Sequence, residues 1–206
     1  MKPLICLTNA SLVINNKLIL DNINLSIEKN ITAITGHNGA GKTSLLKILS
    51  KIYVLTKGSI MYANNIDKNK TSYLFQDSIF LNRTIQENLL HYMKVNNYDR
   101  KYSMRKIKLL MEEFNIFHLI NSHPLEISSG ERQIISFIRG LLIDPEIYFL
   151  DEPFNNLDNN YTEILYSKIR ELSYNIKIVF ISHSDNDIVA LCPEVIELYN
   201  GTIINV

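Results

Sequence analysis

The chain has 206 residues, of which 46% are hydrophobic and 20% charged, so it is long and apolar enough to fold around a substantial core. Its formal net charge is zero, which gives no global basic field and predicts no nucleic-acid partner. The two cysteines, Cys6 and Cys192, lie far apart in sequence, which excludes a disulfide framework or zinc site and indicates a reducing compartment.

No stretch of the sequence is typical of a membrane span or of a secretion signal. The most apolar region, residues 134–150, is interrupted by charged residues such as Arg139 and Asp144. Residues 1–9 lack the apolar core of a signal peptide. We therefore expect a cytosolic protein, unless it docks on a membrane partner.

The N-terminal part, residues 4–27, alternates short apolar runs with asparagine-rich turns. Strands are predicted at 4–7, 11–14 and 23–27, with a turn at 15–17. Polar and apolar residues alternate in the last of these strands, as on a half-buried strand. We interpret the region as an antiparallel β layer.

A phosphate-binding loop follows a predicted buried strand at 31–35 and precedes a predicted helix that runs to about residue 50. Residues 36–43 have the form G-x-x-x-x-G-K-[ST]. The glycines let backbone N–H groups point at phosphate oxygens, and the helix N-terminus adds a partial positive charge. Lys42 can reach the β- and γ-phosphates, and the Thr43 hydroxyl can ligate Mg²⁺. The predicted nucleotide-binding residues of this loop are Gly36, His37, Asn38, Gly39, Ala40, Gly41, Lys42, Thr43 and Ser44.

The segment after the loop changes from strands to helices. Strands are predicted at 57–62 and 71–75, the second ending at Gln76. Residues 84–125 are interpreted as a mostly helical insertion, because apolar residues recur at helical spacing and Thr84 with a glutamate three residues later forms a capping box.

The C-terminal part returns to strands that alternate with helices. Its last strands form a hairpin with an Asn-Gly dipeptide, which is typical of a type I′ turn. The predicted elements are a loop leading into a helix at 127–144, a buried strand at 146–150, a helix at 159–173, a buried strand at 177–181 and the hairpin at 195–204.

Two carboxylates follow the buried strand at 146–150. Asp151 is placed to hold Mg²⁺ through its water shell, and Glu152 is placed to polarise an attacking water as general base. An ordinary core strand followed by an acidic helix cap would produce the same local pattern, so these residues alone leave both interpretations open.

Residues 127–133, Ile-Ser-Ser-Gly-Glu-Arg-Gln, lie just before a predicted helix. They resemble the L-S-G-G-Q signature of the ABC (ATP-binding cassette) ATPases, and their place roughly twenty residues before the Asp-Glu pair makes the resemblance specific. The resemblance implies that Ser128, Ser129, Gly130 and Glu131 face the γ-phosphate of an ATP held by a second subunit. As a bare pattern, these residues could also be a plain helix cap.

Other family motifs occur in the expected order. Gln76 resembles the Q-loop glutamine, which contacts Mg²⁺ and water. Residues 156–158 resemble the D-loop, in which Asp158 lies near the dimer interface. His183 resembles the switch histidine that hydrogen-bonds the γ-phosphate. The resemblance thus implies that the catalytic residues are Glu152, His183 and Gln76, and that the metal ligands are Thr43, Gln76 and Asp151.

The sequence also departs from the family pattern. Ile14 stands where the family has an aromatic residue that stacks on adenine, so an apolar contact would replace stacking. Ser129 replaces a glycine and Glu131 replaces the glutamine of the signature. Ser184 replaces the common aspartate after the switch histidine. None of these changes removes the lysine, the two carboxylates or the histidine, so we expect hydrolysis to survive.

The expected fold is an α/β P-loop NTPase of the RecA-like type, with a mainly parallel sheet, an N-terminal antiparallel β layer and a helical subdomain. The chain is interpreted as one ABC nucleotide-binding domain over 1–206. Residues 1–76 and 146–206 form the ATP-binding core, and 77–145 form the helical subdomain. The implied cofactors are ATP and Mg²⁺, and the implied reaction converts ATP and water to ADP and phosphate.

The resemblance implies two partners: a second nucleotide-binding subunit and a separate transmembrane permease. The expected location is the cytoplasmic face of the membrane. A soluble ABC ATPase in assembly or repair, such as iron–sulfur assembly, is the alternative, and a degenerate regulatory subunit is a third interpretation. The substrate stays undetermined, with weak resemblance to haem-exporter subunits and, through residues 79–81, to tungstate or molybdate importers.

Overall fold

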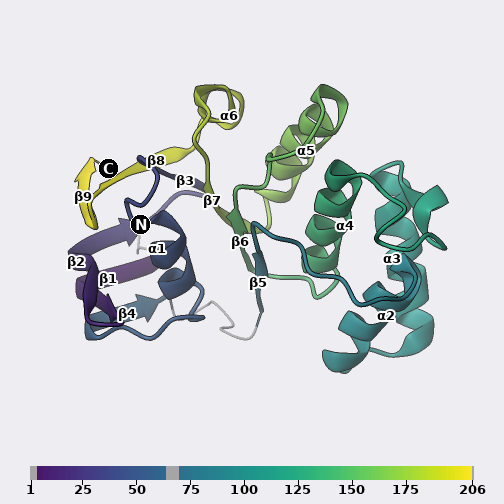
Figure 1. Ribbon diagram of the computed structural model, residues 1–206, viewed down its shortest axis with the longest axis horizontal. Helices are drawn as coiled ribbons and strands as arrows, with labels where there is room; N and C mark the ends of the chain where they lie inside the picture. Colours follow the sequence, from purple (N-terminus) through teal and green to yellow (C-terminus); the bar gives the residue numbers. More distant parts are fainter. Residues whose placement is uncertain (1–3, 64–69, 206) are drawn as a thin grey trace.

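The computed structural model describes residues 4–63 and 70–205, and these contain two β-sheets and two groups of helices (Figure 1). The strands are β1 Ile5–Ile14, β2 Lys17–Ile27, β3 Ile31–Thr35, β4 Lys57–Tyr62, β5 Thr71–Leu74, β6 Ile147–Asp151, β7 Lys177–Ile181, β8 Glu194–Tyr199 and β9 Thr202–Asn205. The helices are α1 Lys42–Leu49, α2 Ile85–Val95, α3 Arg100–Glu113, the 3₁₀ turn η1 Phe117–Leu119, α4 Ser129–Leu141, α5 Asn159–Leu172 and α6 Asp185–Leu191.

The predicted antiparallel layer is present as a sheet in the order β2-β1-β4. The expectation of separate strands at 4–7 and 11–14 was wrong, because β1 runs through both. Asn9 takes a left-handed conformation (φ 47°), and the β1–β2 register shifts between Leu7 and Ala10. An asparagine tolerates this conformation, so the strand can bulge without leaving the sheet. The turn at Asn15 and Asn16 is confirmed, with φ of 49° and 61°.

The larger sheet has the order β5-β6-β7-β3-β8-β9. Neighbouring strands from β5 through β8 are parallel, whereas β9 forms the predicted antiparallel hairpin with β8. All five residues of β6 are buried, because both faces of the sheet are covered. Tyr148 and Leu150 of β6 pack in the core with the helices α2–α5, and Ile147 and Phe149 pack in the core with α1 and the antiparallel layer.

The helical insertion lies at one end of the molecule, opposite the antiparallel layer (Figure 1). The predicted helical segment 84–125 contains α2, α3 and η1, and its capping box at Thr84 is confirmed. The short helix α6 follows β7 and was missed, because its seven residues are too few to show a helical period and its apolar residues are consecutive. Among residues 4–63 and 70–205, no helix combines the length and apolarity needed to cross a bilayer.

Close packing of α4 on β6 depends on Gly140. A Cβ atom added at Gly140 would lie 2.1 Å from the Tyr148 hydroxyl oxygen. The Tyr148 side chain is fully buried, and its hydroxyl donates to the Phe137 carbonyl at 2.8 Å. The tyrosine therefore has no room to move away from a larger residue at position 140.

We expect Gly140→Ala to lower the free energy of unfolding by about 1–3 kcal/mol, because the added methyl group overpacks the contact with Tyr148. Urea denaturation measures this change. Ser136→Ala on the same helix is the control, because Ser136 Oγ is buried and has no hydrogen-bond partner among the described residues. Removing that oxygen should leave stability unchanged or raise it. Equal losses at the two positions would contradict the packing account.

Candidate active site

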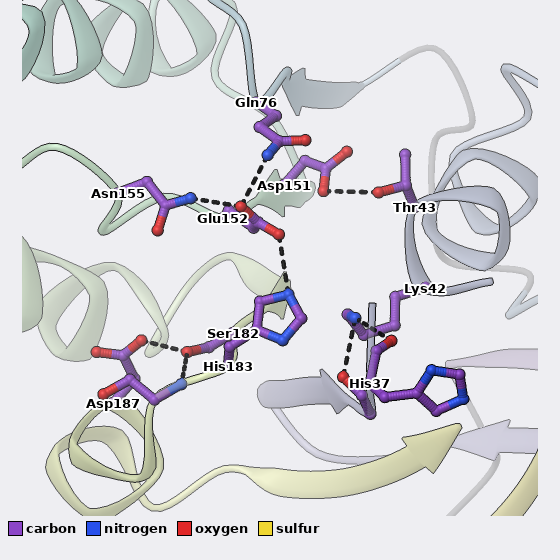
Figure 2. A network of polar contacts seen from close by, with 12 residues as sticks. His37, Lys42, Thr43, Gln76, Asp151, Glu152, Asn155, Ser182, His183 and Asp187 are labelled. Atoms are coloured by element: carbon purple, nitrogen blue, oxygen red, sulfur yellow. Dashed lines mark hydrogen bonds and ion pairs between the residues drawn. The ribbon is translucent and has the colours of Figure 1, made fainter. Parts of the chain in front are cut away.

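The predicted site residues converge because they follow strands of one parallel sheet. The strands β5, β6, β7 and β3 run in the same direction, so their carboxyl ends meet at one edge. Gln76 follows β5, Glu152 follows β6, His183 follows β7, and the phosphate loop follows β3. Figure 2 shows the side chains of these segments pointing toward one another.

The phosphate loop needs glycine at its first position. Gly36 has φ +134°, and a Cβ there would lie 2.1 Å from the Leu198 carbonyl oxygen on β8. The Lys42 side chain folds back over the loop, and its ammonium donates to the carbonyls of Gly36 and His37 at 2.9 Å each. One of its three N–H donors is left for a ligand of the loop.

Lys42 is 6% exposed. Burial lowers its pKa, and the nearby carboxylates of Glu152 and Asp151 oppose that shift. The lysine ammonium therefore lies near two acidic groups at the edge of the sheet.

Asp151 is the last residue of β6, and the alternation of the strand places it on the same face as Phe149, toward α1. Thr43 Oγ1 donates to its Oδ1 at 3.1 Å, and Tyr73 Oη donates to its Oδ2 at 2.9 Å. Burial raises the pKa of Asp151, while the hydrogen bonds from Tyr73 and Thr43 act in the opposite direction. Tyr73 was not predicted, because only the pairing of β5 with β6 brings it beside the carboxylate.

Glu152 leaves the strand in a left-handed backbone conformation, with φ 53°. Its carboxylate is held from three directions (Figure 2). Gln76 Nε2 donates to Oε2 at 2.9 Å, and the Asn155 side-chain amide donates to the same oxygen. His183 Nε2 lies 3.0 Å from Oε1. A strained non-glycine backbone of this kind persists only where its surroundings over-determine it.

A cavity of about 560 Å³ lies between the phosphate loop and these side chains. Ile19 of β2 lines it, whereas the half-buried Ile14 is not among the lining residues and packs in the core of the antiparallel layer. The sequence could not indicate Ile19, because the fold of β2 over the loop decides which apolar residue faces a ligand. The lining residues are Ile19, Asn38, Gly39, Gly41, Lys42, Thr43, Ser44, Gln76, Glu152 and His183.

Three residues of the predicted loop lie behind this cavity. Gly36 and His37 supply the carbonyls that accept from Lys42, and Ala40 is buried. The His37 ring also packs edge-on against Tyr199, with ring centroids 5.1 Å apart. These residues shape the loop, and its cavity-lining surface comes from the other loop residues, Asn38, Gly39, Gly41, Lys42, Thr43 and Ser44.

The signature-like segment does not line this cavity in its own chain. Ser128 is the N-cap of α4, and its hydroxyl accepts from the Glu131 N–H at 3.1 Å. The Glu131 carboxylate accepts from the Ser128 N–H at 2.7 Å, which completes a capping box. Ser128 and Ser129 are exposed. Asp158 is likewise an N-cap, at the start of α5.

Gly130 lies where the N-terminus of α4 meets the segment before α5. A Cβ at this glycine would lie 3.0 Å from the Asn156 carbonyl oxygen, so the N-terminus of α4 packs closely on the segment before α5. The signature-like and D-loop-like residues therefore form one neighbouring surface.

The described residues contain no cluster of three or more His, Cys, Asp or Glu that could hold a metal ion. The predicted ligands instead offer a hydroxyl from Thr43, a carboxylate from Asp151 and the amide oxygen of Gln76. Hard cations such as Mg²⁺ prefer such oxygen donors, and Mg²⁺ in nucleotide sites takes further ligands from phosphates and water.

Residues 20–155 match the protein-family model described as ABC transporter. The chain belongs to the ABC transporter family. As a member of this family it is an ATP-binding subunit, and its ATPase activity is coupled to transport.

Two curated members illustrate the sequence similarity. The zinc import ATP-binding protein ZnuC of Wolbachia sp. subsp. Brugia malayi is 34% identical over 200 residues, which cover 95% of this chain and 79% of that protein. The lipoprotein-releasing system ATP-binding protein LolD of Buchnera aphidicola subsp. Schizaphis graminum is 31% identical over 202 residues, which cover 90% and 88%.

Solved structures of ABC cassettes confirm the fold. The dimeric structure of MJ0796, a bacterial ABC transporter cassette, has a TM-score of 0.84 at 21% identity and covers 98% of this chain and 97% of that one. The structure of cbiO1 from Clostridium perfringens has a TM-score of 0.83 at 20% identity and covers 99% and 88%. The predicted P-loop NTPase core with a mainly parallel sheet is therefore correct.

We expect the free energy of unfolding of Asp151→Asn, relative to the parent, to be higher at pH 7 than at pH 4 when nucleotide is absent and EDTA removes metal ions. Because burial raises the folded-state pKa of Asp151, the folded protein binds its proton more tightly than the unfolded chain does. The stability from that proton is present below the unfolded pKa of about 4 and is lost as pH rises through the folded pKa. A tenfold difference in proton affinity between the folded and unfolded states corresponds to about 1.4 kcal/mol.

Urea unfolding at pH 4 and pH 7 measures the effect, with the exposed Asp21→Asn as control. The advantage of Asp151→Asn should be larger at pH 7 than at pH 4. A variant that is less stable than the parent by the same amount at both values would contradict the electrostatic account.

Proposed function

We propose that two subunits of this type bind two ATP molecules between them and hydrolyse them to drive a separate permease. The convergence of Lys42, Gln76 and Glu152 on one cavity carries the proposal. These side chains come from three segments far apart in sequence, and each supplies a different function that ATP hydrolysis requires.

Lys42 and the loop N–H groups would hold the β- and γ-phosphates. The lysine is buried and positively charged at the edge of the cavity, and the start of α1 contributes the partial charge of a helix N-terminus. Thr43, Asp151 and Gln76 would hold Mg²⁺, whose charge would offset that of the phosphates. The pairing of Thr43 with Asp151 already brings two of these oxygen donors together.

Glu152 would act as the general base. Its carboxylate lines the cavity and is oriented by Gln76 and His183, so it can accept a proton from a water that attacks the γ-phosphorus. The bond from that phosphorus to the bridging oxygen breaks, and ADP and inorganic phosphate leave. His183, which also lines the cavity, would donate a hydrogen bond to the γ-phosphate.

A second subunit would complete the site. Ser128 and Ser129 are exposed at the start of α4, Gly130 is buried beside them, and all three lie outside the cavity of their own chain, as expected of a segment that contacts a partner's nucleotide. The Glu131 carboxylate points back at its own helix N-terminus, so the substitution of glutamate for glutamine does not by itself place a free negative charge against phosphate. Asp158, on the adjacent surface, would lie at the same dimer interface.

The permease and the location at the cytoplasmic face of the membrane belong to the same proposal. The relatives described above are named as subunits for zinc import and for lipoprotein release, and others are named for sulfate or molybdenum import. Because these relatives are named for different cargoes, the cargo of this chain stays undetermined. All of these names are of transport subunits, so a soluble role in assembly or repair gains no support from them.

We expect Glu152→Gln to lower kcat for ATP hydrolysis by at least about a hundredfold, because the amide keeps the shape of the carboxylate but cannot take the proton. ATP binding should be retained. A colorimetric phosphate assay and a fluorescent-nucleotide titration measure the two effects. Glu28→Gln, in the exposed turn after β2, is the matched control.

ATPase activity that survives Glu152→Gln would overturn the assignment of the general base. Loss of ATP binding together with activity would instead place Glu152 in the binding pocket only.

A further inference from the structure

Asp187, on α6, is a buried carboxylate that the proposed reaction does not use. It is 5% exposed, and none of the salt bridges among the described residues involves it. Two hydroxyls satisfy it instead: Tyr166 Oη donates to Oδ1, and Ser182 Oγ donates to Oδ2. Moving a carboxylate out of water costs free energy. A buried carboxylate without a salt-bridge partner therefore calls for a specific structural explanation.

The network lies directly behind His183. Ser182 precedes the histidine, and its hydroxyl oxygen also accepts from the Ser184 N–H at 2.9 Å. The Asp187 N–H donates to the Ser184 carbonyl at 3.2 Å. The residues on both sides of the histidine are therefore tied to Asp187, directly or through one hydroxyl, and Figure 2 shows the bond from Ser182 to Asp187.

Side-chain packing alone does not fix the turn between β7 and α6 that carries His183. His183 lines the 560 Å³ cavity on one side and a second cavity of about 340 Å³ on another, next to Asn186 and Asp187. Its side chain is 38% exposed. With open space around it, the backbone that carries the imidazole depends on hydrogen bonds for its position.

We propose that Asp187 is a positioning residue for His183. Acting through Ser182, it holds the turn between β7 and α6 so that the imidazole stays against Glu152. The inference rests on the catalytic role of His183 in the proposed function.

The chemistry of the network explains why a carboxylate is used. An ionised carboxylate only accepts hydrogen bonds, so it fixes the direction of both hydroxyl protons. The Ser182 proton points to Asp187, which leaves the oxygen lone pairs for the Ser184 N–H. An asparagine at 187 would present an NH₂ group to one of the two hydroxyls and break or reverse that bond.

Tyr166 extends the network to α5. It lies eight residues after the N-cap Asp158, or about 12 Å along the helix axis. The turn that carries His183 is therefore connected to the helix that starts in the D-loop-like segment. If α5 shifted when two subunits close, Tyr166 would transmit that shift to the turn that carries His183.

The test uses Asp187→Asn and Tyr166→Phe, with Asp185→Asn as control because Asp185 is exposed at the start of the same helix. kcat and KM for ATP are measured on the purified chain. Imidazole ¹H–¹⁵N correlation spectra report the environment of His183, whose signal is identified among the five histidines by its loss in His183→Ala.

We expect both variants to shift or broaden the His183 signal and to lower kcat about tenfold, with KM for ATP changed by no more than about twofold. The control should change neither. Tyr166→Phe removes one of the two hydroxyls that hold the Asp187 carboxylate in place for Ser182, so it loosens the same network and answers the question if Asp187→Asn does not fold. An unchanged His183 signal, or an unchanged kcat, in a folded variant would overturn the inference. If His183→Ala itself leaves kcat unchanged, the catalytic role assigned to His183 in the proposed function is what has failed.

Discussion

The site depends on the way β6 ends. Within the strand, alternation sends Asp151 toward α1, where Thr43 and Tyr73 hold its two oxygens. One residue later the backbone turns into a left-handed conformation, and Glu152 faces the cavity instead of following the sheet. Two adjacent carboxylates thus reach different environments: one is buried beside the loop and one lines the cavity. In the proposed function, this difference separates the metal-holding role from the proton-accepting role.

The arrangement also fits the proposal that one chain offers only half of a site. The phosphate loop, the carboxylates and His183 share one edge of the parallel sheet, whereas the exposed start of α4 packs on the segment before α5. Both helix starts carry side-chain caps, so their backbone donors are partly satisfied before any ligand arrives. A phosphate from a partner would meet a preformed helix N-terminus with two exposed serines.

Much of the fold and of the candidate site could be predicted from local sequence. The phosphate loop, the strand before Asp151, the capping box at Thr84 and the Asn200–Gly201 turn each have a signal within a few residues. What local sequence could not indicate depends on contacts between distant segments. Tyr73 reaches Asp151 only through strand pairing, Ile19 faces the cavity only because β2 folds over the loop, and Asp187 meets Tyr166 only through helix packing. At Asn9 the local pattern was misleading. It predicted a break between strands at 4–7 and 11–14, but β1 bulges at this residue and continues.

The central claim is that ATP joins two of these chains, and sedimentation of the Glu152→Gln chain tests it most directly. Bound ATP would persist in this variant, so we predict a monomer without nucleotide or with ADP and a dimer with ATP and Mg²⁺. A chain that stays monomeric while it binds one ATP per molecule, or that has the same oligomeric state with and without ATP, would contradict the account.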